Sequence, residues 1–181
     1  MRTNKVLILL ATVVMGLLVA QGVAADSAPA ASSGQQWNVQ VEKVDTGEVN
    51  IDPAFQVAIY ENILAELQKT KKFEQVYRSG DRRAGTEDEL LILKIKVQKF
   101  DAGSETKRAV TTVAGATKIK VESSLQTRSG QVVKEDVVNA AVRFFGNNMR
   151  VTHNLARNIA KDVKKSTLPE ASTTVSASAG A

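Results

Sequence analysis

Three stretches of the chain alternate between apolar and polar residues, the period of a strand with one buried face. The first contains Trp37, Val39 and Val41 separated by polar residues. The clearest covers residues 91–97, and the third covers 118–126, where lysines and a glutamate alternate with isoleucine and valine. We therefore expect three half-buried strands, with residues 101–104 forming a turn after the second.

Two further strands are indicated by weaker patterns. Residues 73–77 form a short run with Phe73, Val76 and Tyr77, followed by a polar loop at 79–83. Residues 128–131 read Arg-Ser-Gly-Gln, which is typical of a tight hairpin turn. The strand after that turn is expected from Val132 to about residue 145, with a bulge or interruption near 135–136, where its alternation slips.

Apolar residues recurring every three or four positions predict two amphipathic helices. The first opens at Asp52 and Pro53, an N-cap and a first-turn proline, and closes near the lysines of 69–72. The second covers residues 149–165. We therefore expect one α+β domain over 36–167, an antiparallel meander sheet with both helices packed on one face. The expected buried stripes are Phe55, Ile59, Ile63 and Leu67 in the first helix, and Val151, Leu155, Ile159 and Val163 in the second.

The first 25 residues have the organisation of a secretory signal peptide. A short basic start precedes an uncharged apolar run over 6–20, and small residues then lead to Ala25, where we expect cleavage. The alternative is a retained membrane anchor, although a run of about fifteen apolar residues is short for a membrane-spanning helix. After cleavage no stable transmembrane segment is expected. Residues 26–35 read as a flexible linker and 168–181 as a disordered tail, since both are rich in small residues.

Composition excludes several kinds of chemistry. The chain has no cysteine, so disulfides, thiolate catalysis, cysteine metal sites and lipid attachment at an N-terminal cysteine are excluded. Without Arg2 and Lys5 of the leader, 22 basic residues face 19 acidic ones, a net charge of +3. This mild excess of positive charge does not indicate nucleic acid as a partner. A nucleic-acid partner also fits poorly with an exported protein.

Several motifs follow one another in an order typical of a known family. Residues 64–76 read Leu-x-x-Leu, a basic spacer and Phe-x-x-Val; Ala-Gly-Ala at 114–116 precedes the alternating segment 118–126. Residues 127–133 then read Thr-Arg-Ser-Gly-Gln-Val-Val, and Phe-Phe-Gly at 144–146 comes before the last helix. Over about residues 39–165 this order resembles the bacterial secreted family called domain of unknown function 4410. The resemblance implies an envelope protein of unassigned activity and supplies no catalytic residues.

The last helix carries the candidate partner contacts. His153 stands two residues after Val151, about 200° around the helix, and is expected to be a plain surface histidine. No nucleophile or acid in the pattern makes it a catalytic base, and a single histidine without cysteine is not a metal site. We therefore name no catalytic, cofactor-binding or metal residues. The candidate contacts are Arg150, His153, Arg157, Lys161 and Lys164. Two interpretations are open: these residues face an anionic partner, or they form a solvated helix face.

Three other segments are weighed as sites. The lysines at 94, 96, 118 and 120 share one face of two strands, and we expect Glu122 and nearby acids to offset them rather than an acidic partner. Residues 107–116 are expected to form an ordinary edge strand, the alternative being a loop that docks on a partner. The acidic trio at 87–89 lacks the alternating ligands of a calcium loop and is expected to be solvated.

The sequence contains no phosphate-binding glycine loop and no nucleophile elbow. We therefore expect a non-enzymatic, exported protein, periplasmic or secreted, without a cofactor, that binds an envelope protein or an anionic surface. Two alternatives remain: a hydrolase of envelope or cell-wall material, and a structural subunit that self-assembles into a homo-oligomer through exposed strand edges.

Overall fold

The computed structural model describes residues 36–111, 114–143 and 147–170. The predicted leader, the linker to residue 35 and the tail beyond residue 170 lie outside these residues. Within them no helix is long and apolar enough to cross a membrane. The elements are β1 (Asn38–Val41), α1 (Pro53–Thr70), β2 (Val76–Arg78), the short 3₁₀ helix η1 (Arg82–Thr86), β3 (Leu90–Asp101), α2 (Glu105–Val110), β4 (Thr117–Thr127), β5 (Val132–Val142) and α3 (Arg150–Lys165).

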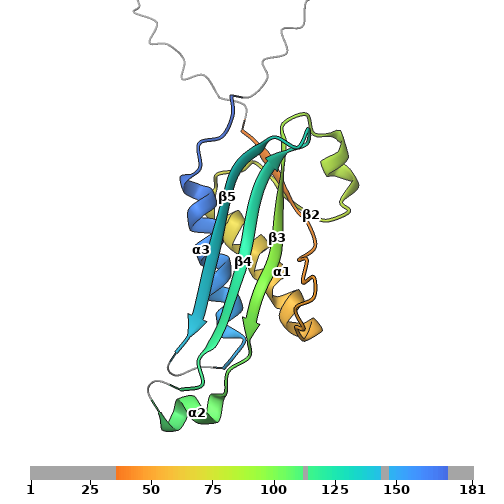
Figure 1. Ribbon diagram of the computed structural model, residues 1–181. Helices are drawn as coiled ribbons and strands as arrows, with labels where there is room; N and C mark the ends of the chain where they lie inside the picture. The colour runs from red at the N-terminus through yellow and green to blue at the C-terminus, as the bar shows by residue number, and fades with distance from the viewer. Residues whose placement is uncertain (1–35, 112–113, 144–146, 171–181) are drawn as a thin grey trace, which may run out of the picture. The chain divides into compact units, whose positions relative to one another are not determined.

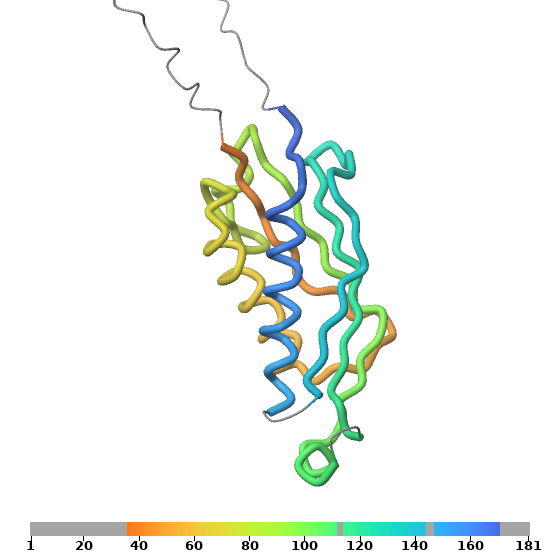
Figure 2. Tube along the Cα trace, turned by 90° about the vertical axis from the view of Figure 1, so that its left-hand side faces the viewer, coloured from red at the N-terminus to blue at the C-terminus, as the bar shows by residue number. Residues whose placement is uncertain are grey.

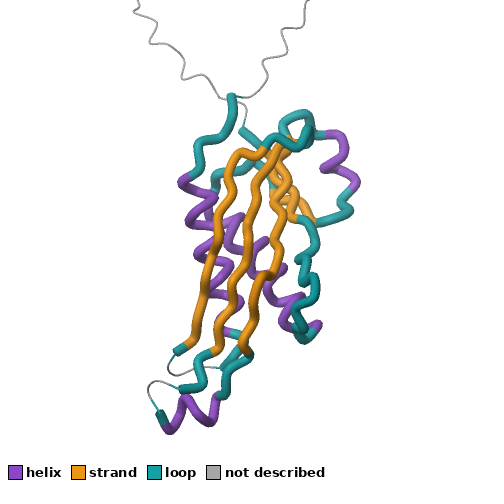
Figure 3. Tube along the Cα trace, in the orientation of Figure 1, coloured by secondary structure: helices purple, strands orange, loops and turns teal. Residues whose placement is uncertain are grey.

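The five strands form one mixed sheet in the order β2-β1-β3-β4-β5 (Figure 1, Figure 3). β3, β4 and β5 are antiparallel neighbours, as predicted, but β1 is parallel to both β2 and β3. The prediction of a pure antiparallel meander is therefore wrong. The reason is the position of α1 between β1 and β2: a helical connection returns the chain to the end where it began, so the next strand runs parallel.

The two long helices pack side by side on one face of the sheet, as Figure 2 shows. Their apolar stripes are buried as predicted, except that Phe55 is only half-buried; Ile59 and Ile63 of α1 and Leu155 and Ile159 of α3 are fully shielded from solvent. From the sheet, alternate residues of β3, β4 and β5 complete the same core. Burying one such leucine or isoleucine stabilises the fold by roughly 1.5–3 kcal/mol, so this layer supplies most of the stability.

The ends of α1 follow from specific residues. The Asp52 carboxylate accepts a hydrogen bond from the Ala54 N–H at 2.7 Å, and Pro53 stands in the first turn, both as predicted. Lys71 ends the helix with a left-handed backbone, φ 52°. The next residue, Lys72, donates its ammonium to the carbonyls of Lys164 and Ser166 at the end of α3. Its charge suits a helix C-terminus, so Lys72 ties the two helices together at this end.

Two register shifts alter which side chains share a face. In the β3–β4 pair, Val97 lies opposite Val121 but Lys99 lies opposite Lys120, so one extra residue is inserted between them. In the β4–β5 pair the shift falls beside Leu125, slightly closer to the hairpin than the break expected at 135–136. A bulge of this kind exchanges the faces of the residues beyond it, which matters for the outer face of the sheet.

The segment expected as an edge strand contains the helix α2 instead, so that prediction is wrong. The Ser104 hydroxyl accepts from the Lys107 N–H at 3.3 Å and opens the helix. Gly115 closes the loop with φ 88°, and a Cβ there would stand 2.5 Å from the Ser104 carbonyl oxygen. Only glycine fits this approach, and it turns the chain into β4.

Arg108 in α2 is buried, with 5% of the residue exposed, and its guanidinium connects this loop to the start of α3. Its Nη1 donates to the Gly115 carbonyl at 2.7 Å and to the Thr117 hydroxyl at 3.0 Å. Its Nη2 donates to Asn148 Oδ1 at 2.7 Å. The bonds fix the β3–β4 and β5–α3 connections against each other.

The two ends of the described chain also meet. The Trp37 indole N–H donates to the Pro169 carbonyl at 3.0 Å, and Leu168 packs in part against the core. Leu168 and Pro169 follow the segment that composition predicts as the domain. Pro169 contacts Trp37, the residue before β1, and Leu168 contacts the core.

Candidate functional site

All five predicted contact residues of α3 are exposed. One side of the helix is buried against the sheet and α1, and at 3.6 residues per turn the basic residues fall on the other side. Arg150 stands at the first turn of α3, and Lys164 lies in its last turn. The helix thus presents a row of basic groups along its length.

His153 lies beside a carboxylate that the sequence did not place there. Its Nδ1 is 3.8 Å from Glu66 Oε1 of α1, and its side chain is 46% exposed. The same oxygen accepts from Lys69 Nζ at 2.7 Å. Since Glu66 is on a different helix, only the packing of α1 on α3 shows that it neighbours this site. His153 is thus a surface histidine with an acidic neighbour.

A shallow groove of about 670 Å³ runs along this face. Three of the predicted residues, Arg157, Lys161 and Lys164, line it together with Lys69 of α1 and residues 139–141 of β5. Arg150 and His153 are not among the lining residues. The exposure predicted for these three residues is confirmed, their role as partner contacts stays a prediction, and the contributions of α1 and β5 come from the fold.

Two amides attach α3 to the edge strand beside the groove. Asn154 Nδ2 donates to the Ala141 carbonyl at 3.2 Å, and Asn158 Nδ2 donates to the Asn139 carbonyl at 2.9 Å. These carbonyls belong to β5, the last strand of the sheet. A stretch of edge strand with occupied acceptors is a poor template for another strand, so this contact protects the edge around residues 139–141.

The lysines on the outer face of the sheet divide into two groups. Glu122 lies directly opposite Lys96, and Lys94 lies opposite Ser124, whose other neighbour is Glu135. Acidic residues therefore stand beside this first pair, as expected. The second group, Lys99, Lys118 and Lys120, has fewer acidic neighbours. Lys99 lies opposite Lys120, and the acid in register with this group is Asp101, which lies opposite Lys118.

This second group lines a hollow of about 470 Å³ formed by Lys99, Asp101, Lys118, Lys120 and Arg143 with residues 139–141 of β5. Lys99 and Arg143 were not predicted as site residues from the sequence. The bulge after Val97 moves Lys99 to the outer face, and the consecutive polar residues Gln98 and Lys99 are the signal that could have shown it.

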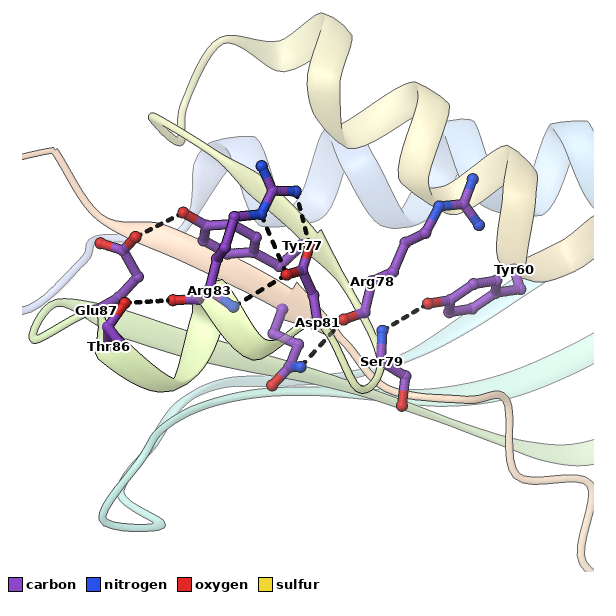
Figure 4. A network of polar contacts seen from close by, with 9 residues as sticks. Tyr60, Tyr77, Arg78, Ser79, Asp81, Arg83, Thr86 and Glu87 are labelled. Atoms are coloured by element: carbon purple, nitrogen blue, oxygen red, sulfur yellow. Dashed lines mark hydrogen bonds and ion pairs between the residues drawn. The ribbon is translucent and has the colours of Figure 1, made fainter.

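The acidic segment 87–89 takes part in a polar network around η1 (Figure 4). Glu87 accepts from the Tyr77 hydroxyl at 2.6 Å and from Asn38 Nδ2 at 2.8 Å. The bond to Glu87 raises the pKa of Tyr77, and the Arg83 guanidinium lowers the pKa of Asp81. Glu87 is half-buried and Glu89 is buried, so the expectation of a solvated segment is wrong for these two residues, and Glu87 serves the fold through its bonds to Tyr77 and Asn38.

Two other pKa shifts mark structural contacts. The Arg78 guanidinium donates to both carboxylate oxygens of Glu61 and lowers the pKa of that group. Partial burial beside the end of α3 lowers the pKa of the Lys72 ammonium. Neither group lines the groove or the hollow, and neither has an arrangement for acid–base catalysis.

Comparison with solved structures shows a shared fold at low sequence identity. A PelC dodecamer from Paraburkholderia phytofirmans matches with a TM-score of 0.51 at 14% identity, over 67% of this chain and 84% of that chain. A single-residue variant of that dodecamer gives 0.53 at 14%, over 74% and 93%. A Xanthomonas campestris protein of the family DUF330 gives 0.50 at 13%, over 72% and 83%. No curated protein matches the sequence.

The fold is thus a mixed sheet covered on one face by two helices, with basic surfaces on both sides of its edge strand. The chain belongs to the family described as Domain of unknown function (DUF4410), whose sequence pattern matches residues 39–146. This confirms the family resemblance found in the sequence.

Proposed function

We propose that this chain is an exported protein of the cell envelope that binds a partner and catalyses no reaction. The observation that carries the proposal is the groove along α3, where Lys69, Arg157, Lys161 and Lys164 face solvent with Glu66 as the acid among the lining residues. Export is supported by the leader pattern of residues 1–25. Among the described residues, the arrangement that most resembles a catalytic pair is His153 with Glu66. This pair is open to solvent and contacts no nucleophile in that part of the chain.

Affinity capture from envelope extract tests the proposal. A tagged chain without its leader is expected to retain an envelope component at low salt and to release it at high salt. Arg157→Glu combined with Lys161→Glu should abolish this capture, because it replaces two groove cations with anions. Lys43→Glu combined with Lys94→Glu changes the net charge by the same amount away from the groove and should not abolish it.

Two results would contradict this function. Capture that is unchanged in the groove variant would remove the groove from the site. Turnover of a cell-wall or envelope substrate that is lost in His153→Ala would show instead that the protein is an enzyme.

A second candidate function is self-assembly, which the shared fold with a dodecameric protein favours. We expect any such assembly to avoid the β5 edge around residues 139–141, because the carbonyls of Asn139 and Ala141 are occupied by α3 amides. Light scattering after size exclusion measures the mass. A mass that stays that of one chain at high protein concentration would exclude it.

A further inference from the structure

The groove along α3 and the hollow on the outer face of the sheet meet on β5. Both are lined by Asn139, Ala140 and Ala141. The carbonyls of Asn139 and Ala141 face the α3 amides, and the Asn139 side chain is exposed between the two surfaces. The two surfaces therefore form one continuous region around the edge strand, which we call the basic belt.

The charge of the basic belt is high for this protein. The helix arm has four cations, Lys69, Arg157, Lys161 and Lys164, against Glu66. The sheet arm also has four, Lys99, Lys118, Lys120 and Arg143, against Asp101. Eight cations against two acids give a net charge of +6, which is more than the +5 of the whole chain. The positive charge of the chain is therefore concentrated here.

These cations are poorly compensated within the protein. Lys69 forms an ion pair with Glu66, but for the other seven no ion pair is found in the described part of the chain. Lys99 and Lys120 lie directly opposite each other on adjacent strands, an arrangement that destabilises a sheet. A solvated face that serves solubility alone would have acids among its lysines. The part of the same sheet nearer the β4–β5 hairpin has them, in Glu122 and Glu135.

The position of the two arms favours a flexible chain over a flat surface. α3 packs on the inner face of the sheet, whereas Lys118 and Lys120 are exposed on its outer face. A bilayer is planar and meets one of these arms at a time. A flexible polymer with regularly spaced negative charges can follow the edge strand and contact both arms.

The other groups of the basic belt favour sugars. Asn154 and Asn158 line the groove and use their Nδ2 atoms on β5, so each retains an amide oxygen as an acceptor for a hydroxyl. The residues that line the two surfaces include no aromatic ring, so base stacking, on which single-stranded nucleic acid relies, is absent, and a sugar chain would be held by charge and hydrogen bonds instead of ring stacking. A sugar chain with carboxylates supplies hydroxyl donors and negative charges together.

We propose that the basic belt binds an extended acidic polysaccharide, with its carboxylates on the lysines and arginines of both arms. This inference rests on the proposed function, because it names the partner class of a binding protein. It adds the sheet arm, which the α3 groove alone does not require.

Titration of the purified chain with polygalacturonate tests the inference, with uncharged dextran and phosphatidylglycerol vesicles as comparison ligands. Polygalacturonate is expected to bind more tightly than both comparison ligands. Its affinity is expected to fall at least about tenfold between low and high salt. Reversal of the helix arm, Arg157→Glu with Lys161→Glu, should weaken binding about tenfold or more. Reversal of the sheet arm, Lys99→Glu with Lys120→Glu, should do the same.

The matched control is Lys43→Glu with Lys94→Glu, which lies in a hollow of mixed charge and should change affinity less than about twofold. Lys99→Gln with Lys120→Gln removes the sheet-arm charge without reversing it and keeps the test valid should the glutamate variant not fold. The inference would be overturned if polygalacturonate did not bind, or if the control lost as much affinity as the arm variants. It would also be overturned if only the helix-arm variant lost affinity. Stronger binding to vesicles would assign the surface to a bilayer. Capture of an envelope protein without polymer binding would overturn this inference and leave the proposed function standing.

Discussion

Arg108→Ala is expected to lower the free energy of unfolding by about 2–4 kcal/mol. The change removes the donors that Gly115, Thr117 and Asn148 share, and it leaves these buried or half-buried acceptors without that partner. Because the bonds join the β3–β4 connection to the start of α3, the loss is expected to loosen both. Urea unfolding followed by circular dichroism measures the change.

The control for this prediction is Lys107→Ala, an exposed cation in the same short helix. It should change the free energy of unfolding by less than about 0.5 kcal/mol. Arg108→Lys should recover part of the loss, since one ammonium reaches fewer acceptors than a guanidinium. Equal stability of the Arg108→Ala and Lys107→Ala variants would show that the guanidinium does not hold these connections.

Leu155→Ala is expected to lower the free energy of unfolding by about 2–5 kcal/mol, because it opens a cavity where α3 packs on α1 and the sheet. Leu155 has no exposed surface. Val57→Ala in α1 is the control: Val57 is 60% exposed, and its loss should cost less than about 0.5 kcal/mol. Chemical denaturation of both variants compares them. A loss below 1 kcal/mol for Leu155→Ala would mean that the helix layer is less tightly packed than the structure shows.

The periodic parts of the fold could be predicted from the sequence. The four-residue spacing of Ile59 and Ile63, and of Leu155 and Ile159, reports a buried helical face directly, because a helix repeats every 3.6 residues. The alternation through 91–97 and 118–126 does the same for strands. Such patterns state which side of an element is buried, and the structure confirms those sides.

Strand direction and local helix formation were harder. Alternation is the same in parallel and antiparallel strands, so it did not show that β1 pairs in parallel with β2. The helix between them was the available signal. For α2, the small residues of 109–116 favoured a strand. The cap at Ser104 and the turn at Gly115 decide for a helix, and they act through backbone geometry rather than periodicity.

The candidate site was predicted where it lies on one helix and missed where it depends on packing. Arg157 and Lys161 follow from helical spacing alone. Glu66 lies near His153 because α1 packs on α3, and Lys99 lies opposite Lys120 because of a bulge. Contacts between elements distant in sequence leave no periodic trace, so only coordinates show them.

The bond between Trp37 and Pro169 has a consequence for how the protein can be handled. It brings the beginning and the end of the described chain to one point, while α2 lies beyond the far ends of β3 and β4 (Figure 1). A fusion partner or a bead attached at residue 36 or at residue 170, the ends of the described chain, therefore leaves from the same place. Immobilisation through either end presents α2 outward and keeps the basic side chains along β5 accessible.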